Sequence, residues 1–104
     1  MIAIAARIVL NPAHVEAFIA EATKLVAPTL KEPGCTWYSF ARDICEPNVL
    51  RISEEWESED HLQAHLRAPH IKAFLAAIST LELLEMVSRQ YEVTSVGPVS
   101  LPAA

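Results

Sequence analysis

The order of strand-like and helix-like segments restricts the fold of this chain more than any other feature. Strand periodicity predicts extended segments at residues 2–10, 35–44, 49–56 and 85–96. Apolar residues at helical spacing predict helices between the first two strands and between the last two. Right-handed crossovers convert this β-α-β-β-α-β order into a ferredoxin-like α+β sandwich, with one antiparallel four-stranded sheet and helices on one face.

Local signals predict where the helices begin and end. Asn11 is a good N-cap and Pro12 fits the first helical position, where a backbone N–H would be unpaired anyway. Pro28 predicts the end of this helix, or a kink in it. Ser58 predicts the N-cap of a short second helix, and Pro69 predicts that a helix starts again.

The first and last strands are apolar on both faces, whereas the predicted helices cover only one face. In the first strand, Ile2, Ile4 and Ile8 alternate with Ala3, Ala5 and Val9. A second copy of the same sheet is the simplest cover for the bare face, so we predict a two-fold homodimer. The sequence divides into a domain over residues 1–96 and an extended tail over residues 97–104.

Charge and length exclude several classes of protein. The chain has 104 residues, a net charge of −5 and only eight scattered basic residues, which argues against nucleic acid as a partner. No basic cluster is present for an anionic membrane, and the longest apolar run, residues 73–78, is far too short to span a bilayer. We therefore predict no nucleic-acid and no membrane partner.

The first ten residues and the two cysteines predict a cytoplasmic location. Residues 1–10 are apolar but contain Arg7 and lack a positively charged start, so they are interpreted as a strand rather than a signal peptide. Cys35 and Cys45 are expected at opposite ends of one extended segment, beyond the reach of a disulfide. Free thiols fit a reducing compartment.

Four histidines are candidates for chemistry. His65 follows Leu62 by three residues, which turns it toward the sheet, either as a hydrogen-bonded core residue or as a functional imidazole. His70 lies at a helix N-terminus, which disfavours its charged form. His14 and His61 are expected to be exposed. Because no carboxylate follows His61 and His65 at metalloprotease spacing, we predict no metal site.

Aromatic and acidic residues cluster in the central hairpin. Tyr38 and Trp56 belong either to the core or to the wall of a pocket for a flat ligand. Glu54 and Glu55 are adjacent in one strand and point to opposite faces, which argues against catalysis by a pair of carboxylates. With Gly34 and Gly97 as its only glycines, the chain cannot contain the common phosphate-binding or dinucleotide-binding motifs.

The stretch from Glu54 to Phe74 resembles a known family. It reads EEWESEDHLQAHLRAPHIKAF, and its E-W-x-S…H-L…P-H-x-x-F spacing is similar to the signature of antibiotic biosynthesis monooxygenase (ABM) domains. Residues 32–35 with Tyr38, and residues 42–43 before the hairpin turn, match as well. The resemblance covers residues 2–92 and implies the dimeric α/β barrel fold.

The resemblance also implies an activity. The best-known members of this family oxygenate quinols or aromatic polyketides without metal or flavin, because the deprotonated substrate itself reduces O₂. We therefore expect a cofactor-independent monooxygenase acting on a small quinol or aromatic polyphenol. The protein would bind the substrate away from water and remove or share a phenolic proton.

Site residues follow from matching positions in the family. His65 matches the helix histidine and is expected to act as base or hydrogen-bond partner. The predicted substrate-binding residues are Trp56 and Tyr38 as pocket walls, Phe74 beneath them, His70 and Arg7.

Two alternatives remain open from the sequence. The first is a non-catalytic ligand-binding or stress-related dimer of the same fold. The second is a haem-binding or haem-degrading protein, because a haem-degrading subgroup shares this fold. The chain departs from that subgroup at three positions: Ala6 stands where it has Asn, His65 where it has a pocket Trp, and Leu75 near its haem-ligating His.

Overall fold

The computed structural model describes residues 1–103. Ala104, the last residue of the predicted tail, lies outside the described residues. The strands are β1 (Ile2–Leu10), β2 (Cys35–Arg42), β3 (Val49–Trp56) and β4 (Leu83–Glu92), and the helices are the 3-10 turn η1 (Pro12–His14), α1 (Val15–Leu30), α2 (Glu59–Leu66) and α3 (Pro69–Ala77).

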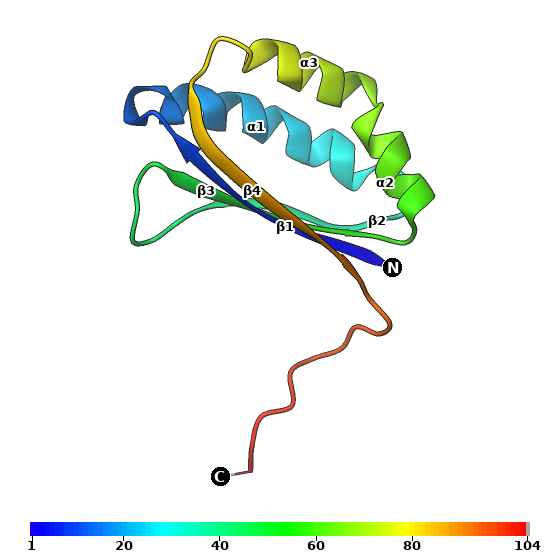
Figure 1. Cartoon of the computed structure of the whole chain (residues 1–104). Helices are drawn as coiled ribbons and strands as arrows, with labels where there is room; N and C mark the ends of the chain where they lie inside the picture. Colours follow the sequence, from blue (N-terminus) through cyan, green and yellow to red (C-terminus); the bar gives the residue numbers. More distant parts are fainter. Residues whose placement is uncertain (104) are drawn as a thin grey trace.

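The four strands form one antiparallel sheet in the order β2-β3-β1-β4. The three α-helices lie together on one side of this sheet, with α1 and α3 side by side above it (Figure 1). This arrangement confirms the predicted ferredoxin-like α+β fold. The sheet of the single chain is open, with β2 and β4 at its edges.

Most predicted boundaries hold, and the exceptions have local causes. Pro28 does not end α1, which continues to Leu30, because a proline in the last turn removes only one backbone donor close to the helix end. The second strand stops at Arg42 because Asp43 turns the chain, its carboxylate accepting from the backbone N–H groups of Cys45 and Glu46. The last strand is Leu83–Glu92 rather than residues 85–96.

Alternating residues of the strands separate two faces of the sheet. The face toward the helices, here called the helix face, carries the buried Ile2, Ile8 and Leu10 of β1. Two clusters pack there against the helices. One contains Ile2, Leu25, Tyr38, Trp56, Leu62 and Ile71, and the other contains Ile8, Leu10, Val15, Phe18, Ala22 and Leu50.

The opposite face, here called the open face, has no helix over it in residues 1–103 (Figure 1). Trp37, Val87 and Tyr91 leave about half of their surface exposed there. Arg7 lies on this face, opposite Arg51 and Val87 in register, and pairs with Glu46 and Glu85. The open face is therefore a mixed apolar and charged surface.

Residues 93–103 follow β4 without forming helix or strand. They run away from the sheet on the side opposite the helices (Figure 1). Val96, Val99 and Leu101 are exposed along this segment. No helix within residues 1–103 has both the length and the hydropathy needed to cross a membrane.

Gly34 is the one residue of the α1–β2 turn that needs a left-handed backbone, with φ of 80°. A Cβ added there would lie 2.3 Å from Cγ of the His61 ring. We expect Gly34→Ala to lower the free energy of unfolding by about 1–3 kcal/mol, because the left-handed backbone strains alanine and the added Cβ overlaps the His61 ring. Gly97→Ala is the matched control, since nothing lies within 4 Å of its added Cβ. Equal urea midpoints for the two variants would contradict this expectation.

Candidate functional site

Four polar residues from different elements meet between the helices and the sheet. His65 comes from the last turn of α2, and His70 follows five residues later, at the start of α3. Glu32 lies in the turn after α1, and Glu54 projects from the helix face of β3. α2 ends at Leu66 and α3 begins at Pro69, so the chain turns between the two histidines and both imidazoles approach one carboxylate.

Hydrogen bonds join three of these residues into what we call the Glu32–His65–His70 cluster. Oε2 of Glu32 lies 2.6 Å from Nδ1 of His65 and 2.8 Å from Nε2 of His70. An ionised carboxylate only accepts hydrogen bonds, so both of these nitrogens carry a hydrogen. A neutral His65 then has its lone pair on Nε2, which lies 4.0 Å from Oε1 of Glu54.

Aromatic rings hold the imidazole of His65 in place. The ring is 4.5 Å from the ring of Trp56 and 5.5 Å from that of Tyr38, between centroids. His65 is only 2 % exposed, and Trp56 is fully buried. Such packing fixes the direction in which each ring nitrogen points, which is what positioned proton transfer requires.

Beside this cluster lies a hollow of about 270 Å³, here called the Glu54 hollow. Apolar side chains form much of its wall: Ile4, Ala6, Ile52, Leu62, Leu66 and Met86. Its polar lining residues are Glu54, Gln63, Ser88, Arg89 and Gln90. Leu66 and Met86 are exposed at its rim, so a bound apolar molecule would remove them from water.

Leu66 follows Leu62 by four residues, a spacing that places both on one face of α2. Leu62 and His65 are buried, whereas Leu66 is half-exposed. The cause is the end of α2 at this residue, beside the hollow rather than over the packed part of the sheet.

Burial perturbs two acids around His65. It raises the pKa of Glu54, while the indole N–H of Trp56, donating to Oε1 at 3.0 Å, and the nearby His65 oppose the rise. Burial, followed by the negative charge of Glu54, also raises the pKa of the Tyr38 hydroxyl. Tyr38 therefore stays protonated at neutral pH, and Glu54 is a stronger base than an exposed carboxylate.

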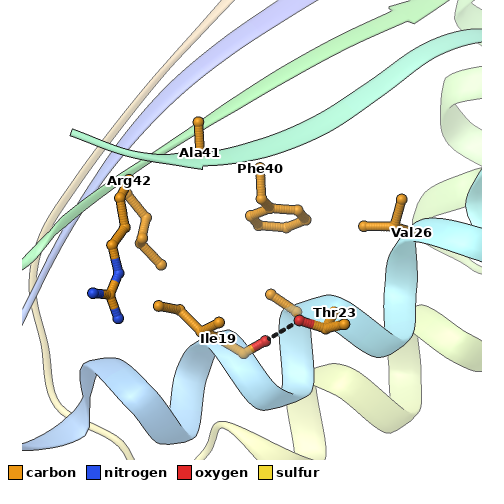
Figure 2. A pocket seen from close by; sticks show the side chains of 8 residues that line it. Ile19, Thr23, Val26, Phe40, Ala41 and Arg42 are labelled. Carbon is orange, nitrogen blue, oxygen red and sulfur yellow. Dashed lines mark hydrogen bonds between the residues drawn. The ribbon is translucent and has the colours of Figure 1, made fainter. Parts of the chain in front are cut away.

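A second hollow, of about 490 Å³, lies between α1 and the edge strand β2. Figure 2 shows the Phe40 ring above Ile19 and Thr23 of the helix, with Val26 at one end and Arg42 at the other. The hydroxyl of Thr23 donates to the Ile19 carbonyl, and Arg42 pairs with Glu16. None of the four polar site residues lines this hollow, so its size alone does not make it the reactive site.

Glu32, His65 and His70 are also residue types that hold divalent cations, and their donor atoms lie within 4.8 Å of one another. Ligands of one tetrahedral zinc ion, each about 2.0–2.1 Å from the metal, are separated by roughly 3.3 Å. The observed separations of 2.6 and 2.8 Å from Oε2 are those of hydrogen bonds. We therefore interpret the cluster as held together by hydrogen bonds.

The structure brings together some of the residues predicted from the sequence. Tyr38 and Trp56 pack against His65, and His70 shares its hydrogen-bond partner, Glu32. Phe74 packs edge-on against Phe18 in the core. Arg7 lies on the open face, across the sheet from His65. Contact of any of these residues with a substrate remains a prediction.

Sequence reasoning missed Glu32 and did not single out Glu54. The Glu54 and Glu55 side chains point to opposite faces, as predicted. A signal for Glu54 was available, because a charged residue on a face that packs against helices calls for an explanation. Glu32 offered no such signal, since it lies in a turn and meets His65 only through the tertiary fold.

Comparisons with known proteins agree with this architecture. The profile of the family described as "Antibiotic biosynthesis monooxygenase" matches residues 1–77. The chain is 36% identical over 81 residues to the Escherichia coli (strain K12) protein called "Probable quinol monooxygenase YgiN", a match that covers 70% of this chain and 77% of that protein.

Two solved structures show the same fold. A conserved protein from Methanosarcina mazei Go1 superposes with a TM-score of 0.80 at 30% identity, covering 86% of this chain and 89% of the other. Rv0793 from Mycobacterium tuberculosis superposes with a TM-score of 0.84 at 22% identity, covering 93% and 98% of the two chains. At that lower identity the likeness concerns the fold alone.

Proposed function

Because this chain belongs to the antibiotic biosynthesis monooxygenase family, which supports a monooxygenase-like function, we propose a specific reaction for it. The protein oxygenates a small quinol or aromatic polyphenol with O₂ and needs no metal or organic cofactor. The quinol supplies two electrons, one oxygen atom enters the substrate, and the other leaves as water. The related protein described as a probable quinol monooxygenase supports this substrate class.

The observation that carries the proposal is a buried imidazole beside a largely apolar hollow. His65 is held by Glu32 through Nδ1, and its Nε2 faces the carboxylate of Glu54, which lines the Glu54 hollow. A phenolic hydroxyl bound in the hollow would lose its proton to this group of residues, and the resulting phenolate would reduce O₂. Apolar side chains form much of the wall of the hollow, so a bound quinol would displace water from beside the anion.

His65 is the centre of the proposed proton-transfer group, and the packing around it assigns supporting roles. Trp56 and Tyr38 form the wall behind the imidazole, and His70 restrains Glu32. Phe74 packs against the core cluster that contains Trp56 and Tyr38. Arg7 takes part in binding only if substrate reaches the open face.

Oxygen uptake with a panel of one-ring and two-ring quinols tests the function directly. We expect uptake that saturates with the quinol and that stays unchanged after dialysis against EDTA. A rate lost with EDTA and restored by a divalent cation would overturn the cofactor-independent mechanism. Oxygen uptake no faster than autoxidation of every quinol would overturn the proposed activity.

We propose that the functional form is a homodimer in which two open faces meet. The half-exposed Trp37, Val87 and Tyr91 on this face support the proposal. At micromolar concentration we expect light scattering to report about twice the 11.5 kDa mass of one chain. Arg7 and its acidic partners would enter this interface, so Val87→Glu should shift the mass toward that of one chain. A wild-type mass of one chain would contradict the proposed dimer.

A non-catalytic ligand-binding dimer of the same fold is the second candidate. The exposed Leu66 and Met86 favour it, because they leave the rim of the Glu54 hollow open in a single chain. Quinol binding detected by calorimetry, without oxygen uptake, would select this candidate.

The cytoplasmic location remains a prediction, with Cys35 and Cys45 both free.

A further inference from the structure

A substrate hydroxyl in the Glu54 hollow can reach Glu54 but cannot reach His65. The His65 side chain is 3 % exposed and does not line the Glu54 hollow. Glu54 lines that hollow, and its side chain is 12 % exposed. Glu54, rather than His65, can therefore touch a molecule in the hollow and remove its proton.

The two oxygens of Glu54 are in different surroundings. Oε1 accepts the indole N–H of Trp56 at 3.0 Å and lies 4.0 Å from Nε2 of His65. Within residues 1–103, Oε2 has no hydrogen-bond partner and is not among the fully buried unpaired atoms. The carboxylate is thus anchored through one oxygen, and the other oxygen is free to accept a bond from a ligand.

We propose that Glu54 is the base that takes the proton of the substrate hydroxyl, with His65 as the group behind it that stabilises the transfer. This assignment rests on the proposed function. The O–H bond of the substrate breaks, an O–H bond forms on Oε2 of Glu54, and the electron pair stays on the phenolate. No oxidant is needed for this step, because the electrons move only when the phenolate meets O₂.

His65 supports this step through its hydrogen-bonded partner. The 2.6 Å contact to Glu32 keeps the hydrogen on Nδ1 and directs Nε2 toward Glu54. The proton taken by Glu54 is on Oε2, so the carboxyl group must turn before its O–H can point at Nε2. A movement of about 1 Å then closes the 4.0 Å gap to an O–H···N hydrogen bond, through which Nε2 can share that proton. Glu32 and His70 are positioning residues in this scheme.

The surroundings of Glu54 suit a base that works near neutral pH. The titratable groups that face it are His65 from α2, Glu32 from the turn after α1, and Tyr38 and Cys35 from β2. Arg89 of β4 alternates with the residues of the helix face and shares the open face with Val87. Burial raises the pKa of Glu54, which strengthens it as a proton acceptor. Activity should therefore fall on acidification at a pH above the ordinary range of glutamate.

The test compares Glu54→Gln with Glu55→Gln, its neighbour on the open face. With the best quinol, we expect Glu54→Gln to lower kcat about 100-fold or more with little change in KM, and Glu55→Gln to stay within about twofold of wild type. Glu54→Asp should recover part of the lost rate, because it restores the carboxylate. Circular dichroism and thermal unfolding show whether each variant folds.

The pH profile separates a base from a structural residue. The acid limb of kcat/KM should be absent from the residual activity of Glu54→Gln and present in Glu55→Gln. A folded Glu54→Gln protein with the wild-type rate or the wild-type acid limb would overturn the assignment and leave the proposed function intact. Wild-type protein without oxygen uptake would overturn the function itself, and the assignment with it.

Discussion

His65→Ala is expected to reduce quinol-dependent oxygen uptake by about 100-fold, the contribution typical of a positioned proton-transfer group. The imidazole is buried against Trp56 and held by Glu32, so its loss removes both the group that faces Glu54 and the partner of Glu32. Water that fills the space cannot reproduce the fixed orientation of the ring. The measurement is kcat/KM for oxygen uptake at neutral pH.

His14→Ala is the matched control for this prediction. His14 accepts the backbone N–H of Glu82 at 2.8 Å and lies outside the Glu54 hollow and the Glu32–His65–His70 cluster. Its loss should affect stability slightly and leave the rate within about twofold of wild type. Equal rates for His65→Ala and wild type would remove His65 from the mechanism, whatever the stability of the variant.

Trp56→Ala should cause the largest loss of stability, about 3–5 kcal/mol in the free energy of unfolding. Trp56 is completely buried, packs on His65 and belongs to the same core cluster as Ile2, Leu25 and Tyr38. Its removal leaves a cavity and frees the carboxylate of Glu54 from the indole N–H. Urea unfolding at one fixed protein concentration measures the loss, because the proposed dimer would make stability depend on concentration.

Trp56→Phe tests the origin of this loss. Phenylalanine keeps most of the apolar packing but donates no hydrogen bond to Glu54, so its cost should be clearly smaller than that of alanine. A similar cost for the two variants would assign most of the effect to the hydrogen bond rather than to the cavity. Unfolding midpoints equal to wild type for Trp56→Ala would contradict the buried position of this side chain.

The order and the faces of the elements could be predicted from the sequence because they depend on neighbouring residues. Alternation along residues 37–40 assigns Tyr38 and Phe40 to one face of β2 and Trp37 to the other, which is how they lie in the structure. Ser58 caps α2 as predicted, its hydroxyl accepting the backbone N–H of His61. The inward direction of His65 followed in the same way from its helical spacing.

The partners of His65 could not be predicted from spacing. Glu32 is separated from it by 33 positions and from His70 by 38. Periodicity states which face a residue occupies, but it does not state which turn of another element lies opposite. The turn at Gly34 and the helix start at Pro69 bring Glu32 and the two histidines together only once α1, α2 and α3 are packed on the sheet.

The amino-acid sequence by itself determined the strand and helix order, the apolar faces and the inward histidine, since short-range periodicity and capping encode these features. Only the tertiary structure decided that one carboxylate holds two imidazoles and that another faces a hollow beside them. The physical reason is that charged groups far apart in the chain meet only after apolar burial has brought their elements together.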